Sequence, residues 1–422
     1  MAPGRLPLIG HVHRLIRDLP GFMREARGQH GDFFRVDLGL GRQLLAVGSD
    51  VAYELLLNRQ VSSDILDGVG AVLNGSIMTM DGARHRRMRK AMAGPFTRAH
   101  LDASTVGALI AEETGALLER WVGAESCAVA EDIRALGLNV IFRLIGVEPE
   151  DLREWSTMYA TMISSRARIP GLAGPSFRAR RWVDAELTKI LQRCRAEGIR
   201  DTLVGALAHG EDEDGGLVDV AELVPSVRLL VLAGYETSAT SIGWSLIELA
   251  EHPELWARLC AEVAGVERAP RTPTELERLP FTVALGREIM RLYTPATVVL
   301  RRTTEVIEIG GHRVEAGREL LFPLCLLNRN PETFPEPDAL RPERWLGPDA
   351  PRGPAQIVPF GGGPHTCLGM HLAHLEVAHV LVAVTKAMAE RGRRPSRRGL
   401  PRPRCSWFPT ARIPDGTQLW WE

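Results

Sequence analysis

One cysteine of this chain lies in a glycine-rich segment whose composition suits metal binding. Residues 360–369 read Phe-Gly-Gly-Gly-Pro-His-Thr-Cys-Leu-Gly and come directly before a long apolar stretch. Positive charge, backbone N–H groups and a helix N-terminus all favour a thiolate over a thiol, and this segment offers all three to Cys367. Its glycines let the main chain approach a flat, bulky partner that a Cβ would clash with. A haem iron is the simplest such ligand, although a lone cysteine in a turn is more commonly a small buried residue without chemistry.

The same segment resembles the haem-binding loop of the cytochrome P450 superfamily, whose pattern is Phe-x-x-Gly-x-Arg/His-x-Cys-x-Gly. The matching residues are Phe360, Gly363, His365, Cys367 and Gly369. In that family the thiolate pushes electron density onto iron and favours O–O cleavage. The resemblance implies haem b as the cofactor and Cys367 as its axial ligand. It also implies that Phe360, His365 and Gly369 contact the cofactor.

A second group of residues could move protons. Residues 233–237 read Ala-Gly-Tyr-Glu-Thr inside an apolar helical run over 224–249. A mid-helix glycine costs roughly 0.5 to 1 kcal/mol, and an acid in such a segment costs more unless it has a use. Reduction of dioxygen consumes two protons, which a hydroxyl fed by an acid can relay through ordered water.

This stretch resembles the Ala/Gly-Gly-x-Asp/Glu-Thr motif of the family's long central helix. The resemblance implies that Thr237 holds the hydrogen bond on the oxygen side and that Glu236 relays protons. It further implies that Gly234, preceded by Ala233, opens a groove for dioxygen. The residues alone leave another interpretation open, a glycine kink with Thr237 bonding back to a carbonyl of its own helix.

A third motif, Glu288-Ile-Met-Arg291, places an acid and a base on one helix face, where they can pair. As an isolated surface pair it would contribute only about 0.3 kcal/mol. The resemblance implies more, because Arg344 in Pro-Glu-Arg-Trp stands where the family's second arginine completes a structural triad. That triad anchors the haem loop and does not react.

Further basic residues match the family's ligands for the haem propionates. His85 and Arg89 stand at i and i+4 of a helical stretch, and arginine's fork suits a carboxylate. The resemblance adds Arg301 and His365. The basic stretch over 84–90 is either a solvated helix face or, as the resemblance implies, part of a docking surface for an acidic ferredoxin.

The composition is compatible with this family, but it would not have identified the family by itself. The chain has 422 residues, 45% of them hydrophobic, and no linker or repeat divides it. The 51 basic and 52 acidic residues nearly balance, which gives nucleic-acid binding no electrostatic support. The scattered cysteines predict neither a zinc site nor disulfides, so a cytoplasmic location is expected. The N-terminus over residues 1–10 has no signal-peptide core and does not begin a run of about 18 apolar residues, so we expect no membrane anchor.

The resemblance covers essentially the whole chain, residues 1–422, and implies a single catalytic domain with the cytochrome P450 fold. That fold is mostly α with a smaller β-rich part, shaped like a triangular prism, with haem between the long central helix and the cysteine loop. Periodicity predicts helices over 101–118, 224–249, 254–263 and 368–388, and strands over 33–38, 43–47, 305–309 and 320–322. No flavin or nicotinamide fingerprint follows a strand, so no fused reductase is expected and electrons would come from NAD(P)H through separate ferredoxin reductase and ferredoxin.

The function implied is that of a monomeric monooxygenase that hydroxylates or epoxidises a hydrophobic small molecule, with a terpene- or polyketide-like natural product favoured. The family recruits substrate contacts from segments that carry mostly apolar residues here. The expected pocket residues are Val72, Leu73, Leu230, Ala233, Val298, Val299 and Trp407. Two alternatives remain, a peroxide-driven peroxygenase and a haem-binding sensor without turnover.

Overall fold

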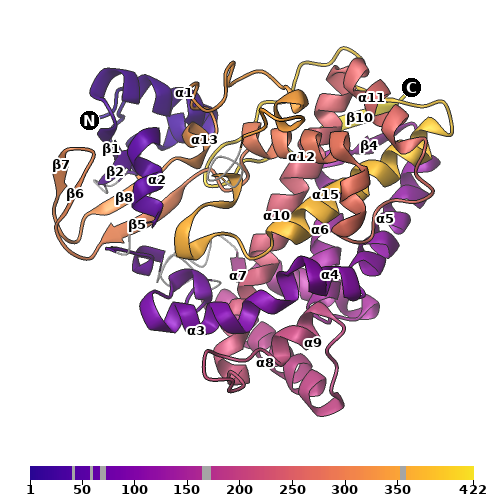
Figure 1. The fold of residues 1–422 in the computed structure, drawn as a ribbon, viewed down its shortest axis with the longest axis horizontal. Helices are drawn as coiled ribbons and strands as arrows, with labels where there is room; N and C mark the ends of the chain where they lie inside the picture. Colours follow the sequence, from indigo (N-terminus) through magenta and orange to yellow (C-terminus); the bar gives the residue numbers. More distant parts are fainter. Residues whose placement is uncertain (40–42, 58–59, 67–72, 164–172, 352–357) are drawn as a thin grey trace.

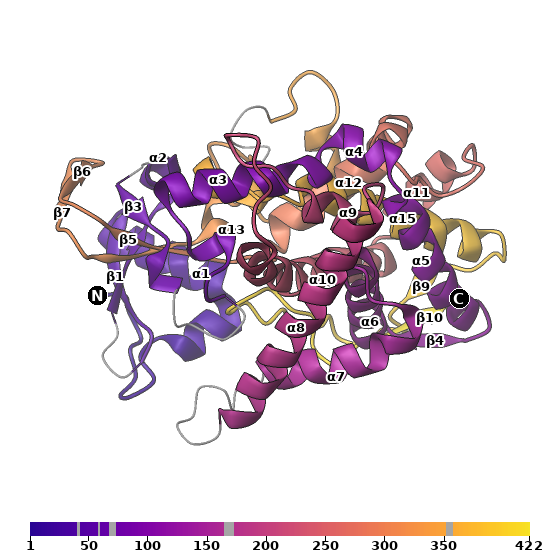
Figure 2. The same ribbon diagram turned by 90° about the horizontal axis from the view of Figure 1, so that it is seen from below.

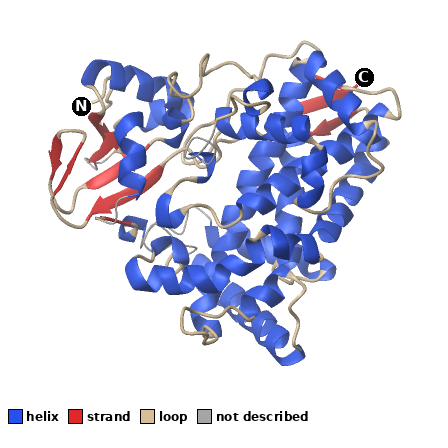
Figure 3. Ribbon diagram, viewed as in Figure 1, coloured by secondary structure: helices blue, strands red, loops and turns tan. Residues whose placement is uncertain are grey.

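The computed structural model describes residues 1–39, 43–57, 60–66, 73–163, 173–351 and 358–422. Helices dominate it, and the strands gather mainly at the end of the molecule that holds the N-terminus (Figure 3). The longest helix, α10 (Val220–Glu251), runs through the middle of the helical part (Figure 1). Seen from below, α3 and α4 lie on one side of α10, and α6 and α7 lie on the other (Figure 2).

Several helices pack directly against α10. Helices α6 (Val129–Leu144), α8 (Gly174–Glu197), α12 (Pro280–Leu292) and α15 (Met370–Ala389) all contact it. The remaining helices are α1 (Val12–His30), α2 (Ser49–Leu57), α3 (Gly82–Ala93), α4 (Arg98–Ala103), α5 (Val106–Val122), α7 (Leu152–Ile163), α9 (Leu203–Ala208), α11 (Pro253–Val263) and α13 (Leu324–Leu327). Short 3₁₀ turns η7 (Pro342–Trp345), η8 (Val358–Phe360) and η9 (Gly363–His365) surround the cysteine loop.

Helix α10 has clear local causes at both ends. The side chain of Asp219 caps its N-terminus by accepting the N–H of Ala221. Its C-terminus is followed directly by Pro253, which disfavours continued helix at the residue before it. Between these ends the helix is apolar on most sides, as a helix enclosed by other helices must be. The sequence therefore favours a long, largely buried helix in the centre of the protein.

The main sheet contains five strands in the order β1-β2-β8-β5-β3. Its strands are β1 (Phe33–Asp37), β2 (Gln43–Val47), β3 (Val61–Ser62), β5 (Val299–Thr303) and β8 (Glu319–Phe322). Strands β2 and β8 pair in parallel and the other neighbours are antiparallel. A three-stranded sheet has the order β4 (Ser126–Ala128), β10 (Gln418–Trp421), β9 (Pro395–Ser396). A two-stranded sheet pairs β6 (Ile307–Ile309) with β7 (His312–Val314).

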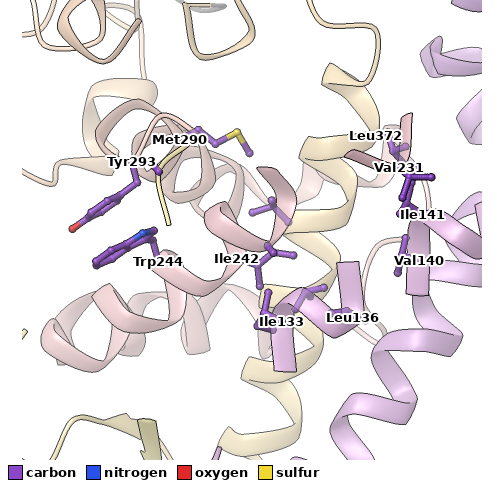
Figure 4. Close-up of a cluster of buried hydrophobic side chains, with 14 of the residues drawn as sticks. Ile133, Leu136, Val140, Ile141, Val231, Ile242, Trp244, Met290, Tyr293 and Leu372 are labelled. Atoms are coloured by element: carbon purple, nitrogen blue, oxygen red, sulfur yellow. The ribbon is translucent and has the colours of Figure 1, made fainter. Parts of the chain in front are cut away.

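The main core lies where α6 packs on α10. Ile133, Leu136 and Ile141 of α6 face Val231 and Ile242 of α10 (Figure 4). Fully burying one such aliphatic side chain contributes about 1.5 to 3 kcal/mol, so this interface fixes the position of α10 strongly. The same close-up shows the Trp244 and Tyr293 rings stacked, with centroids 4.0 Å apart and an interplanar angle of 4°.

Most of the expected elements are present with small shifts at their ends. The predicted runs over 224–249, 254–263 and 368–388 correspond to α10, α11 and α15. The single helix expected over 101–118 was wrong, because α4 ends at Ala103 and α5 begins at Val106. Ser104 is extended there (ψ 170°), and the N–H of Thr105 bonds to the carbonyl of Asp201 from another part of the chain. A tertiary hydrogen bond thus breaks a run that periodicity treats as continuous.

Helix α15 is long and apolar enough to cross a membrane, with a mean hydropathy of 1.4 over its best window. It is the one such helix in the part of the chain that the structure describes, and 67% of that window is buried inside the protein. Its hydrophobicity is therefore explained by packing against α5, α10, α11 and α12.

Candidate haem site and proton relay

The loop that carries Cys367 is held in a defined shape before α15. The N–H of Cys367 donates to the carbonyl of Phe360 over 2.9 Å. Gly363 has a φ of 67°, and a Cβ there would lie 2.3 Å from the carbonyl oxygen of Leu56. Only glycine satisfies both the left-handed conformation and the close approach. The glycine-rich composition therefore sets how the loop lies against α2.

The thiol of Cys367 differs from the sequence expectation in its acid–base behaviour. Its pKa is raised because burial outweighs the opposing effects of the Gly369 N–H and the Arg89 guanidinium. The loop does supply the groups that favour a thiolate, but by themselves they do not overcome desolvation. A bound metal cation would reverse this balance, since a coordinating thiol is deprotonated by the ion's own charge.

The basic side chains expected near the haem are brought together from three elements. The rings of His85 (α3) and His365 (η9) lie with centroids 4.1 Å apart. Arg89 (α3) donates to the carbonyl of Thr366, next to the cysteine. Arg301 (β5) is buried and its charge acts on His85. Burial first, then His365 and Arg89, lower the pKa of His85 to about 4.

The surroundings of Arg301 show whether these residues fit an anionic cofactor. Its guanidinium donates to the carbonyl of Leu300 over 2.8 Å, and burial lowers its pKa to about 10, opposed by Asp81. Across the described ranges, no acidic side chain forms an ion pair with it. A buried cation without a paired anion is costly. The site therefore fits a ligand that brings carboxylates of its own, as the propionates of haem do.

The donor set also fits a metal that arrives inside a macrocycle. Among the residues that the structure describes, no group of three or more His, Cys, Asp or Glu side chains could hold a bare ion. Cys367 is accessible to solvent although the surrounding protein desolvates its thiol, and Ala233 is exposed on the central helix between half-buried neighbours. One accessible thiol, an accessible small residue on α10 and several cations match a flat, anionic, iron-bearing ligand. Its chemistry would be oxygen activation at a thiolate-ligated iron.

Residues 233–237 occupy different faces of α10. The hydroxyl of Thr237 donates to the carbonyl of Ala233 over 2.7 Å, as the alternative interpretation of this motif expected. A Cβ on Gly234 would lie 3.1 Å from Cδ1 of Ile141, so this glycine permits close packing of α6 on α10. On the side where a Cβ would point, Gly234 therefore contacts α6; its role in opening a groove for dioxygen stays a prediction, and the exposed residue of this motif is Ala233.

Glu236 is buried, and its Oε1 lies 2.9 Å from Nε of Arg412. Tyr235 also contacts it: burial first, then the charge and hydrogen bond of Glu236, raise the pKa of Tyr235 to about 12. Tyr235 is therefore directed toward Glu236 and Arg412, away from the face of Ala233. The sequence did not predict that Arg412 contacts Glu236, because no motif in it links these two residues.

A buried acid that the sequence did not predict, Glu376, contacts α10 close to Thr237. The hydroxyl of Ser238 donates over 2.6 Å to Oε2 of Glu376, which comes from α15. Burial outweighs that hydrogen bond and raises the pKa of Glu376 to about 7. The bond ties the central helix to the helix that follows the cysteine loop.

The structural triad assembles behind the loop. Glu288 accepts Arg291 Nη2 over 2.7 Å and Arg344 Nε over 2.9 Å, and all three side chains are at most 9% exposed. Trp345 adds its indole N–H over 2.9 Å. Arg291 also donates to three carbonyls, at Asn328, Pro337 and Ala339. The triad therefore ties α12 to the segment that leads into the haem loop.

The expected pocket residues are less clearly grouped. Leu73, Leu230 and Val298 are half-buried and pack against the main core. Val299 is half-buried against the core of the sheet, and Val72 lies outside the described residues. The ring of Trp407 stacks at 6.3 Å on Tyr293, with the Arg329 guanidinium 5.2 Å from its centroid. Its contacts are thus core contacts, and its role toward a substrate stays a prediction.

The fold and site together define a haem-thiolate protein, and comparison with known proteins identifies its family. The sequence model of cytochrome P450 matches residues 1–168 and 176–386. The chain is 32% identical to the cytochrome P450 BJ-4 homolog of Sinorhizobium fredii, over 93% of this chain and 89% of that protein. It is 30% identical to cyclooctat-9-en-7-ol 5-monooxygenase of Streptomyces melanosporofaciens, over 91% and 87%.

A solved structure agrees on the fold. The retinoic acid-bound cyanobacterial CYP120A1 matches with a TM-score of 0.82 at 22% identity, covering 99% of this chain and 97% of that chain. The chain belongs to the cytochrome P450 family. Family membership confirms the predicted fold class, the bacterial type of the enzyme, the thiolate-ligated haem and the monooxygenase activity.

Proposed function

We propose that the protein inserts one atom of dioxygen into a C–H or C=C bond of a hydrophobic small molecule, with water as the second product. Cys367 would hold the iron of haem b, and His85, Arg89, Arg301 and His365 would hold its propionates. The observation that carries the proposal is the buried acid Glu236 directly before Thr237, on the helix that presents exposed Ala233.

The chain's own residues would control protons and orientation. Thr237 has a hydroxyl that can exchange its bond with the Ala233 carbonyl for one to water or oxygen. Glu236 would pass protons from solvent toward that hydroxyl. The half-buried apolar side chains of Leu73, Leu230 and Val298 would exclude water and bind an apolar substrate. When bound, the haem supplies the oxygen-activating chemistry itself.

For the substrate we propose a cyclic hydrocarbon-like natural product of the terpene or polyketide kind. The apolar segments support this, as do two relatives whose names state their chemistry, cyclooctat-9-en-7-ol 5-monooxygenase and the 26% identical pentalenene oxygenase of Streptomyces avermitilis. Either named compound is a suitable first probe, because each tests the same apolar site.

For the electron donor we propose a separate ferredoxin with its reductase, acting on a cytoplasmic monomer. Arg84, Arg86 and Lys90 are exposed along α3, where Nε of Arg86 lies 3.9 Å from Oε1 of Glu213, and these three side chains would face an acidic partner. Arg87 is not equivalent to them, because it pairs with Asp212 over 2.9 Å and with Glu222 over 2.6 Å. The docking surface would thus use the outer edge of α3.

The test compares two ways of driving the purified, haem-loaded protein. One arm supplies NAD(P)H, ferredoxin reductase and ferredoxin under isotope-labelled dioxygen, and the other supplies hydrogen peroxide. The proposal expects labelled oxygen in the product of the first arm and a large loss of product with Thr237→Ala. Product from peroxide alone, unaffected by Thr237→Ala, would establish the peroxygenase alternative. Haem binding without product in either arm would leave the sensor alternative.

A further inference from the structure

The partner of Glu236 comes from the C-terminal hairpin, which we define as residues 406–412. Its ends pair through two hydrogen bonds between Ser406 and Arg412, of 3.1 Å and 2.8 Å. Arg412 Nε lies 2.9 Å from Glu236 Oε1, and it also bonds to the hydroxyl of Thr410 over 3.1 Å. The side chain of Arg412 is 47% exposed and that of Glu236 is 8% exposed. The ion pair therefore stands where the interior meets solvent.

This contact is built into the packing of the helix. Positions 236, 240 and 243 lie on one face of α10. Thr240 donates its hydroxyl to the carbonyl of Ala411 over 2.7 Å. A Cβ on Gly243 would lie 2.3 Å from Cδ1 of Ile413. The chain over 411–413 thus runs along this face, and its docking brings Arg412 to the carboxylate.

The hairpin is also attached to a segment that is expected to line the substrate pocket. The N–H of Ala411 donates to the carbonyl of Pro295 over 3.0 Å, and the hydroxyl of Thr297 donates to the carbonyl of Pro409 over 3.0 Å. Both partners precede Val298 and Val299, two of the proposed pocket residues. One short hairpin therefore connects the substrate segment to the relay acid.

We propose that Arg412 is a positioning residue that holds the Glu236 carboxylate at the solvent side of α10. This inference rests on the proposed function, in which Glu236 relays protons. In this proposal Arg412 acts only through Glu236, to which its Nε is bound. Without it, the remaining polar neighbour of Glu236 on α10 is the Tyr235 hydroxyl, and the carboxylate turns toward that group. Proton uptake from solvent then becomes slower.

The chain offers a matched control for the charge. Arg134 of α6 lies in the same neighbourhood, since its charge acts on Tyr235, but its own partner is Asp415. Its side chain is 30% exposed. Arg134→Gln removes the same positive charge from this region and leaves the Glu236 pair in place. Arg412→Lys keeps the charge and tests whether arginine's geometry is needed.

The experiment measures NAD(P)H oxidation by the haem-loaded protein with ferredoxin and its reductase, in normal and in heavy water. Arg412→Gln should slow the reaction about fivefold, the effect of losing one partly exposed ion pair. It should also increase the ratio of the rates in the two solvents, because proton uptake becomes limiting. Arg412→Lys should recover most of the rate, and Arg134→Gln should match the parent. Crystal structures of the parent and Arg412→Gln supply a readout independent of turnover, the position of the Glu236 carboxylate.

The Glu236→Gln variant distinguishes the proposed proton relay by Glu236 from the proposed positioning of Glu236 by Arg412. On that background, Arg412→Gln should cause no further loss, because Arg412 acts through Glu236. A further loss there, or an Arg412→Gln variant that behaves like Arg134→Gln, would overturn the inference and leave the relay standing. If Glu236→Gln alone changes neither the rate nor the solvent ratio, the relay itself fails, and the role of Arg412 fails with it.

Discussion

Replacing Glu288 by glutamine should lower the free energy of unfolding by about 4 kcal/mol, the middle of the range for breaking a buried ion pair. The carboxylate accepts hydrogen bonds on both oxygens. Oε1 receives Arg291 Nη2, Arg344 Nε and the Arg341 N–H, and Oε2 receives Arg291 Nε and the Trp345 indole. Glutamine keeps only one acceptor oxygen and turns the other position into a donor.

The magnitude follows from this geometry. If the amide nitrogen takes the place of Oε2, Arg291 Nε and Trp345 Nε1 each lose their acceptor and face another donor. Two such buried losses cost roughly 3 kcal/mol. The missing negative charge between Arg291, fully buried, and Arg344, which is 9% exposed, accounts for the remainder. With an unfolding entropy of roughly 0.9 kcal/mol/K for a chain of this size, the midpoint of thermal unfolding should fall by about 5 °C.

The assay is thermal unfolding of the haem-loaded protein, followed by circular dichroism at neutral pH. Glu343→Gln is the matched control, because Glu343 lies in η7 and pairs with Arg258 while both side chains are about half exposed. That exposed pair should contribute at most about 0.5 kcal/mol. Equal midpoint shifts in the two variants would refute the argument that burial of the triad sets its importance.

The same variant should respond to pH with a defined sign. Burial raises the pKa of Glu288, but the hydrogen bond and charge of Arg291 outweigh it and leave the pKa below its usual value. A carboxylate with a lowered folded-state pKa contributes stability above the unfolded value of about 4.3, and this is lost as the pH falls through the folded value. The gap between parent and Glu288→Gln should therefore shrink below about pH 4.

Three further changes test the site and its packing. Cys367→Ser should abolish the red-shifted Soret band of the reduced, carbon monoxide-bound protein, whereas Cys405→Ser should keep it; a band unmoved by the first change would disprove the axial ligand. Gly234→Ala should cost at most about 2 kcal/mol in urea unfolding, since overpacking of about 1 to 3 kcal/mol against Ile141 is offset by about 1 kcal/mol of helix propensity. Trimming the neighbour with Ile141→Val should recover part of that cost, and an additive pair would contradict the proposed contact. Burial raises the pKa of Glu376 to about 7, so its folded state loses stability relative to Glu376→Gln as the pH rises from about 4.3 through 7; a constant difference over that range would exclude a buried, protonated acid.

The parts of the protein that could be predicted depend on short-range order. Strand β2 was expected over 43–47 and is Gln43–Val47, because its apolar run is bounded on both sides by turn residues. The pairing of Glu288 with Arg291 follows from their positions at i and i+3. The prediction of Cys367 as the iron ligand likewise rests on one contiguous loop, and it stays a prediction. In each case the residues that decide the outcome are close together in the chain.

Gly234 shows that recognising a motif does not establish why each of its residues is needed. The sequence marks a glycine in a helix but not what lies beside it, and an open groove and a helix contact are equally compatible with a missing Cβ. The structure places Ile141 of α6 against it, while Ala233 takes the exposed position. The choice depended on the rotation of α10, which is set by the burial of α6 and α10 side chains across the whole interface.

The contacts of Glu236 lay furthest beyond prediction because they need several distant fits at once. Arg412 reaches the acid only if Thr240 holds the carbonyl of Ala411 and if Gly243 leaves room for Ile413. Thr240 and Gly243 share a helix face with Glu236, but nothing in the sequence shows that the chain over 411–413 packs on that face. An acid buried on the central helix nevertheless requires a partner for its charge. A buried acid in the sequence therefore predicts that some cation lies beside it. That this cation is Arg412 follows only from the way the C-terminal hairpin packs on α10.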